Sequence, residues 1–215
     1  MTQWTENPEG GRARGPGGLV RAWVEVLVRP RRFFANGIGP SDQAPGLVFA
    51  MAVVLVEESV RFALVDDAYP VVADSEPLSA ALWLGVTVLL VAPAAVHLLA
   101  ALQTVLLAPF APDRGGVSET VQVIAYATAP MVLAGVGVPP AFAGVAGLET
   151  AVAVWRLLLA LWGTALFVVG IATVHDTSLP RAAVAAAVPV VVVFGYFFGG
   201  VFAFETATGV SVVGA

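Results

Sequence analysis

Three ionisable residues stand close together inside an apolar segment, where charged side chains are costly. Glu57, Glu58 and Arg61 fall within the otherwise apolar run from Gly46 to Val65. A run of this length crosses a bilayer core of roughly 30 Å. Ionisable residues inside such spans are rare and mark functional sites, and they need partners within the protein. We therefore expect them to contact other polar groups in the fold.

Arg156 is the partner that depth along the helices predicts. It interrupts a later apolar run that begins near Glu149. At about 1.5 Å rise per residue, Glu57 and Arg156 both lie roughly 10–12 Å from the outer ends of their helices. Glu57 and Arg61 are also four residues apart, which favours an intrahelical pair, and Glu58 then remains as a partner for Arg156. We expect these four residues to form one structural ion cluster in the outer half of the molecule.

The composition indicates the class of protein. The 215 residues are 59% hydrophobic and 12% charged, and the mean hydropathy of +0.89 is typical of membrane proteins. No cysteine is present, which excludes disulfides, thiolate metal sites and cysteine nucleophiles. All ten basic residues are arginine and the net charge is -5. This balance fits a GC-rich genome or a salt-loving host.

The apolar runs predict an all-α, polytopic membrane helix bundle of five transmembrane helices. The second run is too long for one straight span and too short for two, so we expect one long helix kinked near Pro93. The third has a small-residue centre and contains Pro130, and we expect it to be the middle one of the five spans. In the last run, Gly195 and Gly199 form a small-residue pair that lets another helix come close. The runs cover residues 46–65, 78–107, 118–138, 149–174 and 180–204.

The arginines predict the orientation of this bundle. Six precede the first run, one lies between the second and third, and one follows the fourth, whereas the external loops have none. Because loops rich in arginine stay in the cytoplasm, we expect the N-terminus inside and the C-terminus outside a cell membrane. Residues 1–18 are then a disordered cytoplasmic tail, and residues 205–215 are a short external tail.

Residues 19–36 predict an amphipathic helix before the first span. Trp23 and Val26 fall on one helical face, Arg21 and Glu25 fall on another, and Pro30 interrupts the segment. An arginine-rich amphipathic segment with Trp and Phe is typical of a helix that lies in the membrane interface. We expect it there rather than packed on a soluble domain, because the chain has no soluble domain.

Three motifs carry a resemblance to a known family. They are VRPRRFF at residues 28–34, AYATAP at 125–130 and HDTSLPRA at 175–182. In this order and spacing the chain resembles the Yip family, membrane proteins first named for interacting with Ypt/Rab GTPases, and is similar to its prokaryotic members. The family-motif positions are Pro30, Phe33, Tyr126, Pro130, His175 and Arg181.

The resemblance implies a helical membrane protein without a known catalytic site or cofactor. In eukaryotic relatives the family is linked to vesicle traffic and GTPase recruitment. Since this chain lacks their long cytoplasmic domain, we do not expect GTPase binding. We expect a non-enzymatic, membrane-organising or partner-recruiting scaffold. Its partners are the lipid bilayer, a second copy of the chain or other membrane proteins, and no nucleic acid.

An enzymatic alternative rests on the same charged residues. The run EESVR at residues 57–61 is similar to the paired-glutamate motif of CAAX-type intramembrane proteases. That family places three residues between the second glutamate and the arginine, where this chain has two, and His97 and His175 lack the neighbours that its motif requires. Two histidines do not make a metal site, and Ser59 has no histidine at helical spacing to act as its base. We therefore expect no catalytic or metal-binding residues.

Transport is the second alternative. Charges inside spans mark substrate pathways often enough to suggest one, and interrupted helices line cavities in transporters. The runs show no clear internal repeat, however, and the charges lie at one depth rather than along a route. A small transporter or channel with its charged cluster in the outer half of the bundle is thus the alternative to the scaffold.

Overall fold

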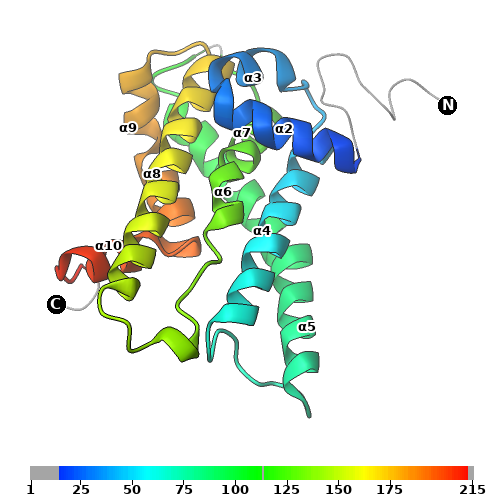
Figure 1. Ribbon diagram of the computed structural model, residues 1–215. Helices are drawn as coiled ribbons and strands as arrows, with labels where there is room; N and C mark the ends of the chain where they lie inside the picture. The colour runs from blue at the N-terminus through cyan, green and yellow to red at the C-terminus, as the bar shows by residue number, and fades with distance from the viewer. Residues whose placement is uncertain (1–14, 113, 213–215) are drawn as a thin grey trace.

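The chain forms an all-helical bundle in which one helix lies across the end of several long ones (Figure 1). This computed structural model describes residues 15–112 and 114–212, and no strand occurs in that part of the chain. The elements are α2 (Pro16–Val28), α3 (Pro30–Gly37), α4 (Ala44–Leu64), α5 (Glu76–Val86), η1 (Thr87–Val91), α6 (Ala92–Leu107), α7 (Val117–Ala127), η2 (Ala129–Leu133), η3 (Pro140–Phe142), α8 (Leu148–Val174), α9 (Leu179–Val190), η4 (Val191–Phe197) and α10 (Gly200–Thr208).

Three helical stretches among the described residues are long and apolar enough to cross a membrane: Glu76–Leu107, Leu148–Val174 and Leu179–Phe197. The first is one continuous helix, as the run 78–107 predicts. Its irregular part is the π-helical turn η1, which directly precedes the turn containing Pro93. Proline removes a backbone donor at this point. The helices α4 and α7 do not join this set, because α4 carries three charged residues and α7 is short.

The third apolar run lies at the centre of the bundle. The helix α7 packs against α4, α6 and α8, and every residue from Thr120 to Met131 is buried. The α-helix ends at Ala127, however, and the chain continues as the 3-10 helix η2. Pro130 explains the change, because its ring crowds the preceding turn and it has no N–H for an α-helical hydrogen bond.

Two tryptophans from other helices donate hydrogen bonds to this broken segment. Nε1 of Trp23 in α2 donates to the carbonyl oxygen of Ala129 at 2.8 Å. Nε1 of Trp155 in α8 donates to the carbonyl oxygen of Leu133 at 3.1 Å. Backbone pairing within a 3-10 helix has poor geometry, and weakly paired backbone groups are costly in hydrocarbon. The two indoles therefore hold α2 and α8 against the central segment.

The amphipathic segment contacts the bundle through its aromatic side chains. Phe33 and Phe34 are 1% and 2% exposed, and the Phe33 ring meets the Tyr126 ring edge-on with centroids 4.8 Å apart. We expected these rings in lipid; they pack on α7 because an aromatic core gives them favourable edge-to-face contacts. The interfacial position of residues 19–36 stays a prediction. The helix already begins at Pro16, and residues 1–14 of the predicted tail lie outside the described part.

The last apolar run is divided into two helices. The stretch that starts at Leu179 ends in the π-helical segment η4, and α10 begins after Gly199, whose φ is 69°. Figure 1 shows α10 turned away from α9, and it packs on α8. Glycine adopts positive φ at little cost, so Gly199 is a hinge rather than part of a helix-packing pair. The close approach lies at Gly163, where a Cβ would be 2.3 Å from Cε1 of Phe194.

The first prediction tests the indole contact to the central segment. Trp23→Phe keeps an aromatic ring and removes the donor to Ala129, so we expect the free energy of unfolding to fall by about 1–3 kcal/mol. Denaturant unfolding in detergent micelles measures this loss. Trp162→Phe is the matched control, because its indole is exposed on α8. Equal losses in the two variants would contradict the role of the hydrogen bond.

Candidate functional site

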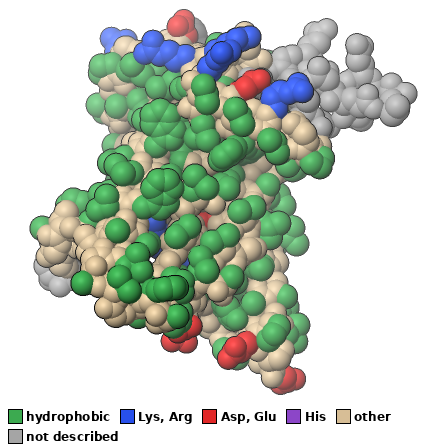
Figure 2. Space-filling view, viewed as in Figure 1, with side chains coloured by type: hydrophobic (Ala, Val, Ile, Leu, Met, Phe, Trp, Pro, Cys, Tyr) green, Lys and Arg blue, Asp and Glu red, His purple; other side chains and the backbone are tan. Residues whose placement is uncertain are grey.

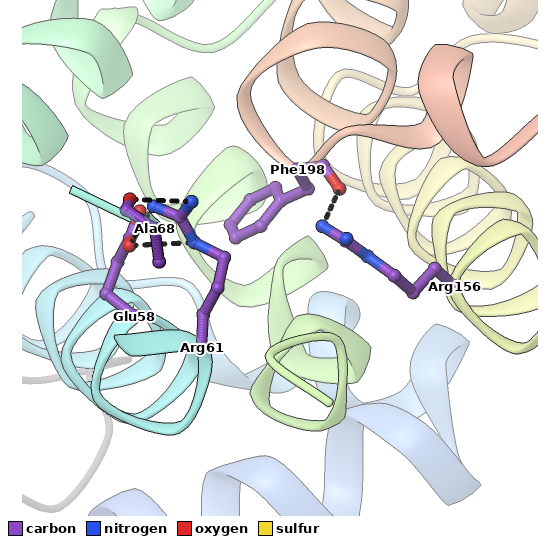
Figure 3. Close-up of polar contacts among 5 residues, drawn as sticks. All are labelled: Glu58, Arg61, Ala68, Arg156 and Phe198. Carbon is purple, nitrogen blue, oxygen red and sulfur yellow. Dashed lines mark hydrogen bonds and ion pairs between the residues drawn. The ribbon is translucent and has the colours of Figure 1, made fainter. Parts of the chain in front are cut away.

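Arg61 contacts its own helix and the loop that follows it (Figure 3). Its Nε donates to Oε2 of Glu58 at 3.0 Å, and its Nη2 donates to the same oxygen. Its Nη1 donates to the carbonyl oxygen of Ala68 at 3.2 Å. Both side chains of the ion pair are largely shielded from solvent. Arg61 thereby ties the loop between α4 and α5 to the end of α4.

Arg156 reaches from α8 to the break between η4 and α10. Its Nη2 donates to the carbonyl oxygen of Phe198 at 3.4 Å. This carbonyl follows the C-terminal end of η4, where the helix dipole favours a positive charge. A Cβ on Gly199 would lie 3.1 Å from the same nitrogen. Arg156 therefore stabilises the junction at which the last apolar run divides.

Glu57 is the most deeply buried member of the cluster. It is 4% exposed, and the turn after η2 passes directly over it, since a Cβ on Gly135 would lie 2.1 Å from the Glu57 carbonyl oxygen. Its charged neighbours are Glu58, Arg61 and Arg156. Within residues 15–112 and 114–212, however, no hydrogen bond or ion pair engages its carboxyl group. Such a group is costly to bury unless something compensates it.

A chamber of about 80 Å³, partly open to the surface of the bundle, is lined by Glu57. Its lining includes Glu57 and Glu58 of α4, Thr87 of η1, and Phe197 and Phe198 at the end of η4, and the remaining walls are mostly apolar. The two π-helical segments of the described chain therefore meet at the same chamber. Departures of this kind from the α-helix are frequent at functional sites.

The structure gathers the four predicted cluster residues but pairs them differently. We expected Glu57 to bond to Arg61 or Arg156. Arg61 bonds to Glu58 instead, because that carboxylate faces the same loop, and Arg156 bonds to a backbone carbonyl. Depth along the helices does not predict the Phe198 carbonyl as an acceptor, because this carbonyl is available only where the helix breaks after Phe198. Glu57 is left facing the chamber.

In the described part of the chain, the two histidines bond to groups other than these glutamates. The described residues contain no group of three or more His, Cys, Asp or Glu that could hold a metal ion. Nδ1 of His97 donates to the Pro93 carbonyl oxygen at 2.7 Å, one turn earlier in its own helix. Glu57 and Glu58 therefore have a buried acidic environment without the histidine partners of the protease motif.

A second polar site lies where α8 ends beside the start of α7. Nε2 of His175 lies 3.2 Å from Oγ1 of Thr120, which lies 3.2 Å from Oγ1 of Thr104. His175 is 2% exposed. Burial lowers the pKa of its imidazole to about 4, Arg114 adds to this effect, and Glu119 opposes it. His175 thus joins α8 to α7 as a neutral hydrogen-bonding group.

Gln122 is an important residue that the sequence interpretation missed. Its side chain is 1% exposed and makes two hydrogen bonds to the backbone of Gly39. The Gly39 N–H donates to Oε1 at 3.0 Å, and Nε2 donates to the Gly39 carbonyl at 2.7 Å. These bonds hold the α3–α4 linker on the central helix. A polar residue inside a buried apolar run was the signal available, because buried amides require partners.

The family-motif positions lie around α7 and at the end of the bundle that carries α2 and α3. Most of them begin, end or interrupt helices, so their chemistry is structural. Pro30 opens α3, Phe33 and Tyr126 pack ring to ring, Pro130 lies in η2, His175 ends α8, and Arg181 is exposed in the first turn of α9.

These features define an integral membrane protein, built from apolar helices around a broken central one, with a charged cluster beside a partly open chamber. A scan against family models matches residues 24–201 to the Yip1 domain. The chain therefore belongs to the Yip family, which confirms the resemblance in its motifs. Searches of curated proteins and of solved structures gave no match.

The second prediction distinguishes the two possible partners of Arg61. In a double-mutant cycle, Glu58→Gln and Arg61→Gln should show a coupling free energy of about 1 kcal/mol. The cycle of Glu57→Gln with Arg61→Gln should show a smaller value, because no hydrogen bond links those side chains. Chemical unfolding of the single and double variants in micelles supplies both numbers. A larger coupling free energy for Glu57 with Arg61 than for Glu58 with Arg61 would support the i,i+4 pair expected from the sequence.

The third prediction concerns the pH dependence that His175 imposes on stability. The folded protein binds the His175 proton more weakly than the unfolded chain, whose histidine has a pKa of about 6.5. Stability is therefore complete above that pH and falls by about 2–3 kcal/mol as the pH drops toward 4. Thermal unfolding between these values should show a steeper decline in the native protein than in His175→Gln. An equal decline in the two proteins would rule out His175 as the source of the pH dependence.

Proposed function

We propose that this Yip-family protein is a non-enzymatic scaffold that organises the membrane or recruits partners at its cytoplasmic face. A basic surface held at one end of the bundle carries the proposal. Figure 2 shows blue side chains gathered at the end that bears α2 and α3. The exposed arginines among the residues there are Arg21, Arg29, Arg31, Arg32 and Arg181.

The support for this surface comes from the bundle itself. Trp23 bonds to the central segment, Phe33 and Phe34 are buried, and Gln122 fixes the linker after α3. The arginines are thus displayed on anchored helices. Exposed valines on α2 lie beside them, and arginines next to apolar side chains suit a surface of anionic lipid. Each such arginine contributes about 1 kcal/mol near that surface.

The charge distribution supports a bundle of five spans with a cytoplasmic N-terminus. The spans are α4, the helix from α5 to α6, α7 with η2, α8, and α9 with η4. A broken span such as α7 with η2 is tolerated where protein surrounds it, and every residue from Thr120 to Met131 is buried. The opposite end of the bundle carries exposed acidic residues: Asp66, Asp67, Asp74, Glu76 and Glu149.

The fourth prediction tests this orientation. Reporter fusions after Gly18 and after Arg114 should give cytoplasmic signals, because both sites lie on the arginine-rich side of the bundle. Fusions after Asp74 and after Val213 should report the outside. Alkaline phosphatase and green fluorescent protein activities measure the two locations. A cytoplasmic signal from the Val213 fusion would contradict five spans.

The scaffold proposal is tested by asking which lipids the full chain gathers around itself in nanodiscs. The nanodiscs contain a mixture of zwitterionic and anionic phospholipid. Mass spectrometry of the lipid that stays bound after detergent extraction measures the enrichment. We expect R21Q/R29Q/R31Q/R32Q to lose the anionic enrichment, because the basic surface is removed. The matched control D66N/D67N/D74N/E76Q changes as many charges at the other end. Loss in both variants, or in neither, would sink the proposal.

A small transporter or channel is the second candidate function. The observation that favours it is the chamber beside the charged cluster, because interrupted helices around an internal cavity are typical of transporters. Proteoliposomes loaded with a pH-sensitive or cation-sensitive dye test it directly. Flux that depends on Glu57 would favour this candidate over the scaffold.

A further inference from the structure

We propose that the chamber beside Glu57 is a binding site for a small primary alkylammonium ion. The site lies inside the bundle, away from the basic surface that carries the scaffold function. Glu57 lines the chamber and is 4% exposed. Its carboxyl group has no hydrogen-bonding partner among the described residues.

The surrounding arginines leave this carboxyl group available. Arg61 is engaged by Glu58 and by the Ala68 carbonyl. Arg156 is engaged by the Phe198 carbonyl, and Figure 3 shows its guanidinium group pointing to that carbonyl. Neither arginine bonds to Glu57. A buried carboxylate of this kind is stabilised by a cation that donates hydrogen bonds to it.

The walls of the chamber select an organic cation. A primary ammonium group donates up to three hydrogen bonds, and the Glu57 carboxylate and the Thr87 hydroxyl are acceptors in the lining. The rings of Phe197 and Phe198 also belong to the lining, and aromatic faces attract ammonium groups. The other walls, such as Val54 and Leu99, are apolar and suit a short alkyl chain.

An inorganic cation is less suited to the same space. Hard cations such as Ca²⁺ take six to eight oxygen ligands in roughly regular geometry. The oxygen-bearing side chains in the lining are Glu57, Glu58, Thr87 and Thr128, and Glu58 is already bonded to Arg61 and Thr128 to the Ala125 carbonyl. The chamber volume of about 80 Å³ also exceeds what a bare ion fills. It is about half of the 150 Å³ of an apolar cavity that accepts benzene, so the fitting ligand is a short chain such as propylammonium.

The two π-helical segments explain why a chamber exists at this position. Thr87 and Val91 come from η1, and Val193 and Phe197 come from η4. Each π-helical turn widens its helix and displaces side chains from α-helical register. Where two such segments line one cavity, close packing is interrupted and space for a ligand remains.

The test is a titration of the purified full chain in nanodiscs with propylammonium chloride. Binding to the folded state raises the unfolding midpoint as the ligand concentration increases, and calorimetry measures the affinity directly. Potassium chloride at equal ionic strength controls for screening. Tetrapropylammonium controls for size and for hydrogen bonding, because it is too large and has no N–H donor. We expect a midpoint increase with propylammonium alone.

Two variants locate the site. Glu57→Gln should weaken propylammonium binding by about tenfold or more, because a neutral amide replaces the charged acceptor. Glu149→Gln is its matched control at an exposed position and should bind as the native protein does. Ala95→Leu keeps the carboxyl group and fills the chamber, since Ala95 is in its lining. It should also abolish binding, whether or not Glu57→Gln folds.

Three other outcomes would overturn the proposal of an amine site. An unchanged midpoint and no heat of binding in the native protein would show that the chamber takes no amine. Equal stabilisation by potassium would show an inorganic-ion or screening effect. Binding that survives Ala95→Leu would place the amine elsewhere on the protein. None of these outcomes bears on the lipid recruitment test, which depends on the arginines of α2 and α3.

Discussion

The fold depends on how the protein satisfies the backbone of a helix that breaks at its centre. Pro130 ends the α-helical pattern of α7, and the first three residues of the following 3-10 segment, Ala129 to Met131, are buried in the bundle. Backbone polar groups in hydrocarbon need partners. The indoles of Trp23 and Trp155 provide two of them from opposite sides. The same contacts determine where α2 and α8 lie, so the break organises the helices around it.

The need of polar groups for partners in hydrocarbon also explains how the arginines of the charged cluster are bonded. Arg61 and Arg156 each use a carbonyl at the end of a helix or in a loop, and Arg61 adds a carboxylate from its own helix. These arrangements need no long-range ion pair, whose desolvation is costly. They also leave Glu57 as the cluster carboxylate that has no hydrogen-bonding partner within the described part of the chain.

The two ends of the bundle differ in construction as well as in charge. Several contacts join the helices at the α2 and α3 end. They are the aromatic ring contacts, the hydrogen bonds between Gln122 and Gly39, and the buried contact between His175 and Thr120. At the other end, the loop after α4 is attached through Arg61 and through the Trp83 indole, which donates to the Pro70 carbonyl. An anchored basic face opposite an acidic, loop-rich face suits a protein that presents one side to its partners.

The sequence by itself determined the helical membrane class and the family, because hydrophobicity and short motifs are local properties of the chain. Only the tertiary structure decided the partners. Arg61 had carboxylates at both i−4 and i−3, and the loop selected Glu58. Arg156 found a carbonyl that exists because the chain turns at Gly199. Hydrogen-bond partners and chambers form between helices that are far apart in the sequence. A local sequence pattern does not predict which of these helices contact one another.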